Sequence, residues 1–394
     1  MRILYHHRTR SRDGQRVHID GLVGAFRRAG HEIEIVAPTL RVESPRPGAQ
    51  RHGSVEPRDE SGPPRASALR EAAELAYNLV ESARLRAAAR RFQPDALYSR
   101  HALFTTSPGS AAAALALPLV IEVNAPLALE RARHGGLSFE ALARRLETRA
   151  LNRADRVVAV TKALADRLAE QGVAREKLEV HWNGLEPEAL ARRPDGAAVR
   201  RRLGVDQNLV LGFVGFVRDW NRLERAFPFL AKEPRAVLLL VGEGPDRPRL
   251  EREASRAGVA DRVRFLGTVA RSEVIDHVAA FDVALLPETP EYASPLKLLD
   301  YLAAGRALLA PDRRNLREVI SDGENGLLFD PERPSAFDEK LAALAASSER
   351  RERLGAAARA TIDRLGLTWD RNAARVVALF AAEIERRRAA GGVR

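Results

Sequence analysis

The sequence predicts an α/β protein made of two doubly wound domains, each with a parallel sheet covered by helices on both faces. Short apolar runs typical of buried strands alternate with stretches of helical periodicity along nearly the whole chain. The chain has 394 residues, which at about 150 residues per domain is enough for two domains. Ligands of such sheets bind beyond the carboxyl ends of the strands, so functional residues are expected in the loops that follow them.

The first domain is expected to span residues 1–195, with helices between its strands. The strands expected there are Ile3–His6, Glu32–Ala37, Ala96–Tyr98, Leu119–Val123, Arg156–Val160 and Leu178–His181. The expected helices are Gln15–Ala29, Ala68–Phe92 and Ser138–Asn152. Residues 41–67 interrupt the alternation with prolines, glycines and mixed charges, which predicts a long loop.

A second series of the same kind follows the linker signal Pro194-Asp195-Gly196, and the second domain is expected at 203–367. Its expected strands are Val210–Val214, Ala236–Val241, Val263–Leu266, Val283–Leu286 and Ala307–Ala310. The tail, Thr368–Arg388, carries apolar residues at helical spacing after a complete α/β unit. We therefore expect 368–394 to form a helix that packs back on the first domain.

Composition excludes several classes of protein. The chain has no cysteine, which rules out a disulfide scaffold, a thiol nucleophile and a zinc ribbon. The longest apolar run, Ala111–Ile121, is much shorter than the roughly 20 residues of a membrane-spanning helix. The N-terminus lacks the apolar stretch of a signal peptide, so a cytoplasmic location is expected. The 64 Lys+Arg exceed the 53 Asp+Glu, and the net charge of +11 favours anionic partners.

The strongest local signal lies between Ser294 and Gly305, after an expected strand. Ser294 is predicted to cap a helix that has Pro295 at its first position, and the free amides of such a helix start favour an anion. Lys297 lies in the first turn, where the helix dipole disfavours a cation unless an anionic ligand offsets the cost. Asp300 follows one turn later and is suited to accept hydrogen bonds from a diol. A Lys297–Asp300 ion pair on an ordinary surface helix is the alternative at this point.

Other loops add weaker signals. The loop at Gly212–Arg218 is glycine-rich and bears an arginine, and Val241–Pro245 follows the next expected strand. Between the first strand and helix, Gly14 leaves room for a phosphate. The chain has neither a P-loop nor a full G-x-G-x-x-G, which counts against a kinase, an ATPase or a nicotinamide dehydrogenase.

Several motifs in this order resemble those of one enzyme family. In the first domain they are Gly14 before Val17-His18-Ile19, Ala29–Glu32, Ile121–Leu127, Arg153–Thr161 and Asn183-Gly184. In the second domain they are Phe213-Val214-Gly215, Val241–Pro245, Phe265–Gly267, Ser294–Gly305 and Asp322–Leu328. Together they resemble the GT-B glycosyltransferases of the large retaining family 4, also called glycosyl transferases group 1. The resemblance covers nearly the whole chain and implies two Rossmann-like domains that face each other across a cleft.

The resemblance implies a glycosyltransferase that moves a sugar from a nucleotide-sugar to an acceptor hydroxyl with retention. In it, Arg218 contacts the diphosphate, the helix start after Ser294 caps it, Asp300 holds the ribose, the backbone near Leu266 meets the base, and Gly14 closes over the phosphates. The donor-binding residues so implied are Gly14, Arg218, Arg222, Leu266, Ser294, Pro295, Leu296, Lys297 and Asp300.

The chain departs from the family pattern in two places in the second domain and in one place in the first. The family has two glutamates eight positions apart, whereas here Tyr292 takes the first place, with Glu291 one position early, and Asp300 takes the second. The usual phosphate lysine is missing after the first strand of the second domain, and Arg222 and Lys297 are the candidates to replace it.

Cleavage of a glycosyl–phosphate bond leaves negative charge on the diphosphate, which fixed cations and amides stabilise as it develops. Arg218 and Lys297 are the candidate catalytic residues for this role. No D-x-D triplet occurs in the chain, so neither a metal nor another cofactor is expected.

Acceptor recognition is expected in the first domain, where His101, Glu122 and Asn124 lie at or shortly after the ends of expected strands. Asn124 replaces a histidine common in the family. The acceptor is expected to be a glycan, a lipid-linked sugar or a small molecule. Contact with an anionic inner membrane face is a further expectation, from the basic residues Arg84, Arg86, Arg90, Arg91, Arg131, Arg133, Arg144, Arg145 and Arg149.

Two other functions remain open. The missing first glutamate and the missing histidine also fit a glycosyltransferase-like subunit that binds its ligand without turnover. The net charge also fits a protein that binds nucleic acid or another polyanion. Against that class, aromatic residues make up only 5% of the chain and no stacking motif is present, so nucleic acid is not an expected partner.

Overall fold

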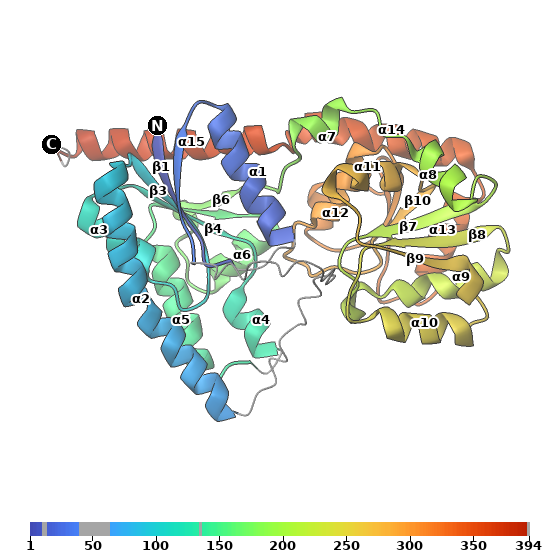
Figure 1. Ribbon diagram of the computed structural model, residues 1–394, viewed down its shortest axis with the longest axis horizontal. Coiled ribbons are helices and arrows are strands. Elements are labelled where there is room, and N and C mark those ends of the chain that lie inside the picture. Colours follow the sequence, from blue (N-terminus) through green and yellow to red (C-terminus); the bar gives the residue numbers. More distant parts are fainter. Residues whose placement is uncertain (10–13, 39–63, 134–135, 392–394) are drawn as a thin grey trace, which may run out of the picture. The chain divides into compact units, whose positions relative to one another are not determined.

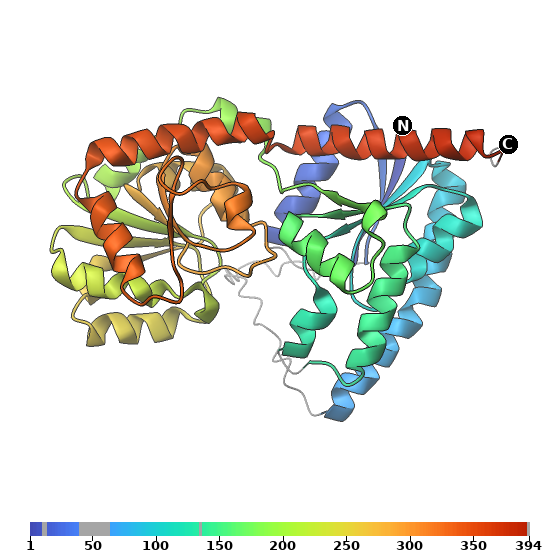
Figure 2. The ribbon, with the colours of Figure 1, turned by 180° about the vertical axis from the view of Figure 1, so that it is seen from behind.

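The computed structural model describes residues 1–9, 14–38, 64–133 and 136–391. The chain forms two compact units (Figures 1 and 2). Unit 1 contains Met1–Trp182 and Trp369–Arg394, and unit 2 contains Asn183–Thr368. None of the helices in the described part of the chain is both long and apolar enough to cross a membrane.

Unit 1 has a six-stranded parallel sheet with the order β2-β1-β3-β4-β5-β6. Its strands are β1 (Arg2–His6), β2 (Glu32–Val36), β3 (Ala96–Arg100), β4 (Leu119–Val123), β5 (Arg156–Ala159) and β6 (Leu178–Val180). Its helices are α1 (Gly14–Arg28), α2 (Pro64–Phe92), α3 (Ser107–Leu115), α4 (Leu127–Arg133), α5 (Glu140–Asn152), α6 (Lys162–Glu170) and α15 (Trp369–Ala389). The sequence analysis missed α3, α4 and α6, and most of the loop predicted at 41–67 lies outside the described residues.

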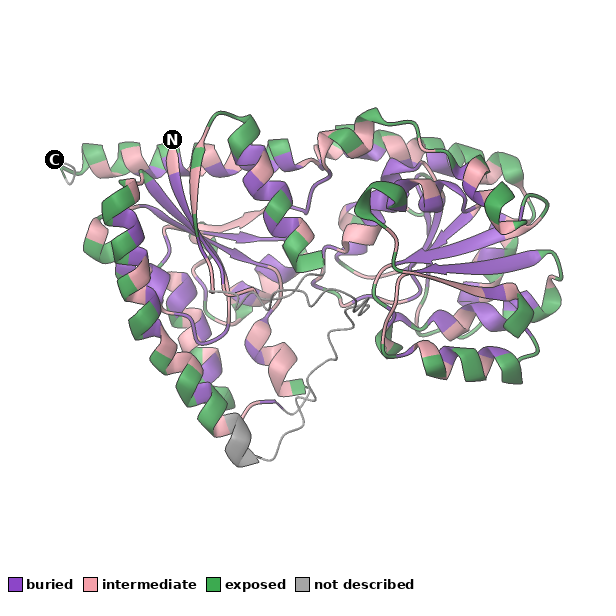
Figure 3. Cartoon of the chain, viewed as in Figure 1, coloured by how far each residue is buried: buried purple, intermediate pink, exposed green. Residues whose placement is uncertain are grey.

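Unit 2 repeats the architecture with the strand order β12-β11-β10-β7-β8-β9. Its strands are β7 (Leu209–Val214), β8 (Ala236–Val241), β9 (Val263–Gly267), β10 (Val283–Leu285), β11 (Ala307–Pro311) and β12 (Leu327–Phe329). Its helices are α7 (Pro187–Ala191), α8 (Gly196–Leu203), α9 (Phe227–Lys232), α10 (Arg247–Arg256), α11 (Arg271–Ala279), α12 (Leu296–Ala303), α13 (Ala336–Ala345) and α14 (Ser348–Leu365). The central strands of both sheets are buried (Figure 3), and the predicted class of two Rossmann-like α/β domains is confirmed.

The boundary between the units differs from the one expected at residue 195. The amide of Leu185 donates to the carbonyl of Leu367 at 3.0 Å, and Arg359 donates to the carbonyl of Leu190 at 2.7 Å, so residues 183–195 belong to unit 2. The segment read as a linker begins α8 instead, because the Asp195 carboxylate accepts the amide of Ala198 as an N-cap.

Helix α15 lies against α1, and a glycine makes this contact possible (Figure 1). A Cβ on Gly21 would overlap the indole of Trp369, and the same indole lies edge-on to His18 with 4.7 Å between ring centroids. Arg28 donates to Asp370 at 3.0 Å through Nε, and Asn372 donates to the carbonyl of Trp182 at 2.6 Å. The α1–α15 contact therefore depends on close packing at one small residue and is completed by polar contacts on either side.

We expect Gly21→Ala to lower the free energy of unfolding by about 1–3 kcal/mol, because the new methyl group would overpack the Trp369 indole. Gly24→Ala on the same helix is the matched control, since its Cβ would meet only the flexible end of Arg28 at 3.2 Å. Urea denaturation of both variants measures the effect. Equal stability of the two variants would contradict the packing argument.

Candidate functional site

The loops at the carboxyl edge of the unit 2 sheet come together through backbone alone. Gly215, Gly242 and Gly267 follow or end β7, β8 and β9 with φ of +129°, +132° and +71°. The amide of Gly242 donates to the carbonyl of Gly267 at 2.8 Å, and a Cβ on Gly242 would overlap the carbonyl of Gly215. A Cβ on Gly244 would overlap the carbonyl of Val217 in the same way. Positions 242 and 244 thus have no room for a side chain, and the loops after β7 and β8 meet backbone to backbone.

Lys297 lies beside this backbone surface, in the first turn of α12. Its Nζ is 3.8 Å from the centroid of the Phe213 ring and would be 3.1 Å from a Cβ placed on Gly215. Within the described chain no carboxylate lies within ion-pair distance of Lys297, and burial of the amine lowers its pKa to about 7. The alternative of a Lys297–Asp300 ion pair is therefore wrong. An anion bound here would restore the charge balance of the amine.

Asp300 is paired with an arginine that the sequence did not single out. Its carboxylate, in a residue only 5% exposed, accepts two hydrogen bonds from Arg271, one from Nη1 at 2.9 Å and one from Nη2 at 2.8 Å. Burial raises the pKa of Asp300, and the guanidinium of Arg271 acts in the opposite direction. Arg271 is the first residue of α11, and nothing in its local sequence indicated a partner on α12.

The start of α12 differs from the prediction that Ser294 caps it. The helix begins at Leu296, Pro295 occupies the N-cap position, and no side chain caps the helix. The hydroxyl of Ser294 instead accepts the amide of Asn183 at 3.1 Å, and the Asn183 side chain donates to the carbonyl of Ser294 at 2.7 Å. Ser294 therefore ties two segments of unit 2 together, and the first amides of α12 have no serine competing for them.

Arg218 lies in the loop that follows β7. Its guanidinium lies 4.6 Å from the ring centroids of both Phe216 and Trp220, which are 40% and 42% exposed. The backbone of Arg218 is held in a turn, since its amide donates to the Oδ1 of Asn221 at 2.9 Å. Two aromatic faces thus restrict the orientation of the guanidinium in this loop.

The structure places the other predicted donor residues as follows. Arg222 has φ of +54° and lies 3.8 Å from Glu224, with an exposed side chain. Leu266 is half-buried on β9, one residue before Gly267. Gly14 begins α1 in unit 1 and is exposed, and its role toward a phosphate stays a prediction.

In unit 1, Glu122 at the end of β4 is the centre of a buried hydrogen-bond network. Its Oε2 accepts from His18 at 2.8 Å and from Tyr98 at 2.6 Å, and its Oε1 accepts from Arg100 at 3.0 Å and from Asn124. These donors hold the pKa of Glu122 far below its ordinary value despite burial. A carboxylate so placed is a poor proton acceptor, so its role is to orient the groups around it.

The other acceptor-side residues also have protein partners. Asn124 donates to Glu122, and the Nε2 of His101 lies 3.1 Å from Oε1 of buried Glu147. The sequence did not single out Tyr98 and Arg100 as members of this network. Both lie on β3, and only the pairing of β3 with β4 brings their side chains to Glu122.

Several of the basic residues expected to form a charged surface have partners within unit 1. Arg84 donates to the carbonyl of Ala37 at 2.7 Å, and Arg131 donates to Glu74 at 2.7 Å. Arg91 pairs with Glu34, and Arg144 pairs with Glu140. In the described part of the chain, Arg145 and Arg149 make no ion pair.

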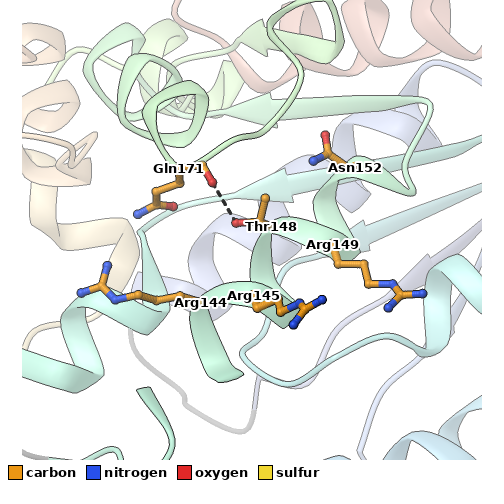
Figure 4. A pocket seen from close by; sticks show the side chains of 6 residues that line it. All are labelled: Arg144, Arg145, Thr148, Arg149, Asn152 and Gln171. Atoms are coloured by element: carbon orange, nitrogen blue, oxygen red, sulfur yellow. Dashed lines mark hydrogen bonds between the residues drawn. The ribbon is translucent and has the colours of Figure 1, made fainter. Parts of the chain in front are cut away.

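These two arginines line a shallow groove of about 670 Å³ on the solvent side of α5 (Figure 4). The groove is lined by Arg144, Arg145, Thr148, Arg149, Asn152 and Gln171. Thr148 donates to the carbonyl of Gln171 at 3.2 Å, which joins α5 to the end of α6. The exposed apolar residues Phe139 and Leu142 precede the arginines along α5.

Two family models match the chain in succession. Residues 12–189 match Glycosyltransferase Family 4, and residues 208–347 match Glycosyl transferases group 1. Among solved structures, HepE from Anabaena in complex with UDP has a TM-score of 0.73 at 17% identity and covers 96% of this chain and 100% of that one. Sucrose-phosphate synthase from Thermosynechococcus elongatus has a TM-score of 0.75 at 17% identity and covers 98% of this chain and 100% of that one.

The curated relatives include enzymes named D-inositol 3-phosphate glycosyltransferase. The one from Xylanimonas cellulosilytica is 36% identical over 198 residues, which are 48% of this chain and 46% of that protein. The one from Streptomyces scabiei is 30% identical over 251 residues, which are 60% of this chain and 56% of that protein. The chain thus matches about half the length of these relatives.

The fold has two Rossmann-like units, and in the second unit the loops at the carboxyl edge of the sheet meet through their backbone. Because the family models match both units in order, the chain belongs to the GT-B glycosyltransferases of the group 1 and family 4 type.

We expect Glu122→Gln to lower the free energy of unfolding by roughly 3 kcal/mol at pH 7, because it leaves Arg100 and His18 without their buried counter-charge. The pKa of Glu122 is depressed in the folded protein, so its contribution is complete above its unfolded pKa and is lost as the pH falls. The difference in the free energy of unfolding between the parent and Glu122→Gln should therefore narrow below about pH 4.5. Denaturant unfolding at several pH values measures it.

Glu140→Gln is the control for this variant, because Glu140 pairs with Arg144 on an exposed helix face and should contribute less than about 1 kcal/mol. A Glu122 variant no less stable than this control would show that the network is not a stabilising centre.

Proposed function

We propose that the chain transfers a sugar from a nucleotide-sugar to an acceptor hydroxyl and that unit 2 binds the nucleotide. One observation carries the proposal: Lys297 and Asp300 lie one turn apart on α12, beside a sheet edge where glycines let the loop backbones meet. A cation that has no carboxylate partner among the described residues suits a diphosphate, and a fixed carboxylate suits a ribose diol. UDP is the first nucleotide to test, since the titles of the HepE structures name UDP and UDP-glucose.

In this proposal the diphosphate binds Arg218, Lys297 and the first amides of α12. Asp300 accepts hydrogen bonds from the ribose, and the backbone near Leu266 meets the base. When the glycosyl–phosphate bond breaks, the electron pair stays on the diphosphate oxygen, and the two cations stabilise the added charge. Neither a resident metal nor another cofactor takes part in this scheme. Transfer with retention of configuration is part of the proposal and rests on the family resemblance.

The acceptor is proposed to be a hydroxyl of a glycan, a lipid-linked sugar or a small polyol. The relatives named for inositol 3-phosphate favour an acceptor that carries a phosphate.

We also propose that α5 makes a peripheral contact with an anionic membrane at the cytoplasmic face. Two observations support it: Arg145 and Arg149 have no ion-pair partner in the described chain, and the apolar side chains of Phe139 and Leu142 are exposed nearby. Sedimentation with anionic vesicles at low and high salt tests this contact, and binding that salt does not weaken would contradict it.

A thermal-shift panel of UDP, GDP, ADP and dTDP and their sugars tests the donor proposal. A nucleotide present at about 100 times its dissociation constant should add about 2.7 kcal/mol to the free energy of unfolding. No shift with any nucleotide would contradict donor binding. A shift without release of nucleotide from the sugar would instead favour a subunit that binds without turnover.

Asp300→Ala should weaken UDP binding about 10- to 150-fold, because hydrogen bonds between the carboxylate and the ribose contribute about 1.5–3 kcal/mol. Calorimetric titration with UDP measures the loss. Asp322→Ala is the control, since its carboxylate accepts the amide of Leu328 and the amine of Lys340. An Asp300 variant with parental affinity would show that the nucleotide lies elsewhere.

Because the pKa of Lys297 is about 7, kcat/KM should fall as the pH rises above 7, approaching tenfold per pH unit as the amine loses its proton. Lys297→Ala should remove this limb and lower kcat more than it weakens UDP binding, since the charge acts on the leaving group. Lys340→Ala should keep the parental profile. A parental profile in the Lys297 variant would exclude this lysine from the reaction.

A further inference from the structure

The pair formed by Arg271 and Asp300 has a geometry that goes beyond a surface ion pair. The two terminal nitrogens of one guanidinium each donate to a different oxygen of one carboxylate, at 2.9 Å and 2.8 Å. The carboxylate side chain is 7% exposed, whereas the arginine side chain is 47% exposed. This bidentate pair with the first residue of α11 fixes the plane of the Asp300 carboxylate.

We infer that Arg271 is a positioning residue for the donor site, which keeps the Asp300 carboxylate ionised and oriented so that its remaining lone pairs accept the ribose hydroxyls of the nucleotide. The inference rests on the proposed function, because it assigns Asp300 to the ribose. It adds a residue that touches neither the sugar nor the diphosphate in that scheme and acts only through Asp300.

Charge and burial support this role. Burial raises the pKa of Asp300, and Arg271 is the group that opposes the rise. A protonated Asp300 would lose its charge and part of the acceptor capacity that a diol needs. Without Arg271, the buried carboxyl would therefore hold its proton at a pH closer to neutral.

Other charged groups around the pair do not replace Arg271. Glu186 acts on Arg271 and favours its charged form, and Lys297 lies beside Gly215. On α11, Glu273 lies in the first turn, Asp276 is bound by Arg192 and His277 is bound by Arg202. On α14, Arg359 donates to the carbonyls of Ala303 and Leu190. Tyr301 on α12 accepts the amide of Val214 and donates to Leu285.

The test is the affinity for UDP between pH 5 and pH 8, measured by calorimetry for the parent, Arg271→Gln, Arg271→Lys and Asp300→Asn. Each variant is compared with the parent through the ratio of their Kd values at the same pH. UDP and Lys297 titrate in both measurements, so their effects on Kd cancel in this ratio. For Arg271→Gln, the ratio should rise as the pH falls, approaching tenfold per pH unit below the raised pKa of Asp300. Arg271→Lys keeps the positive charge but cannot form the two parallel hydrogen bonds of the guanidinium, so its Kd ratio should rise less as the pH falls.

Asp300→Asn mimics the protonated residue and should bind UDP weakly, with a ratio that does not change with pH. The double variant Arg271→Gln, Asp300→Asn should match Asp300→Asn, because Arg271 acts through the carboxylate. The double variant also has no unpaired buried charge, so it keeps the test decisive if Arg271→Gln alone unfolds: binding weaker than that of Asp300→Asn would show a direct contact of Arg271 with UDP and overturn the inference.

Arg192→Gln is the matched control. Arg192 forms the other arginine–aspartate pair on α11, with Asp276 at 2.7 Å, and should give a ratio near one at every pH. A ratio for Arg271→Gln that stays constant with pH, while Asp300→Asn loses affinity, would overturn the inference and leave the donor site intact. Parental affinity of Asp300→Asn would overturn the proposed donor site itself, and the inference with it.

Discussion

The contact of peptide groups at the carboxyl edge of the unit 2 sheet is the constraint on which the proposed site depends. The carbonyl of Gly215 lies where a side chain at position 242 would have to be, and the carbonyl of Val217 does the same for position 244. The loops after β7 and β8 can therefore meet only because both positions are glycine. Lys297 lies beside the two loops, next to Gly215 and the Phe213 ring. Without the polar backbone of these loops, the Lys297 amine would lie against Phe213 as a desolvated charge.

The charged groups of Glu122 in unit 1 and Lys297 in unit 2 are both buried, but the protein balances their charges in opposite ways. In unit 1, Glu122 has four hydrogen-bond donors, two of them on side chains that carry or can carry positive charge. The protein itself supplies the hydrogen bonds of that carboxylate, and this network makes the carboxyl end of β4 more rigid. In unit 2, burial lowers the pKa of Lys297 and no described carboxylate opposes the effect. An incomplete electrostatic balance of this kind is costly in a resting protein and is typical of a site completed by its ligand.

The sequence predicted the strands of both sheets except the short β12, because apolar runs that alternate with helical stretches indicate burial. It also singled out Lys297 and Asp300, since a lysine in a first helical turn conflicts with the helix dipole. It failed on Ser294, whose hydroxyl is bound by Asn183, because a local capping pattern contains no information about a partner far away in the chain. The same reason explains why His18, Arg100 and Arg271 were not assigned. Their partners come from other strands or helices, and only the folded topology brings them together.

The aspartate at position 300, where the family has a glutamate, is explained by its pairing with Arg271. The resemblance places a glutamate at this position, and an aspartate is one methylene shorter, so its carboxylate stays closer to the α12 backbone, where Asp300 is buried. Burial alone would favour the neutral acid. A fork-shaped donor from the neighbouring helix compensates for the shorter side chain in charge and in orientation, which a lysine could do only in charge. The shorter acid and Arg271 are thus best understood as one unit, and the acid keeps the ionised form that a ribose-binding residue requires.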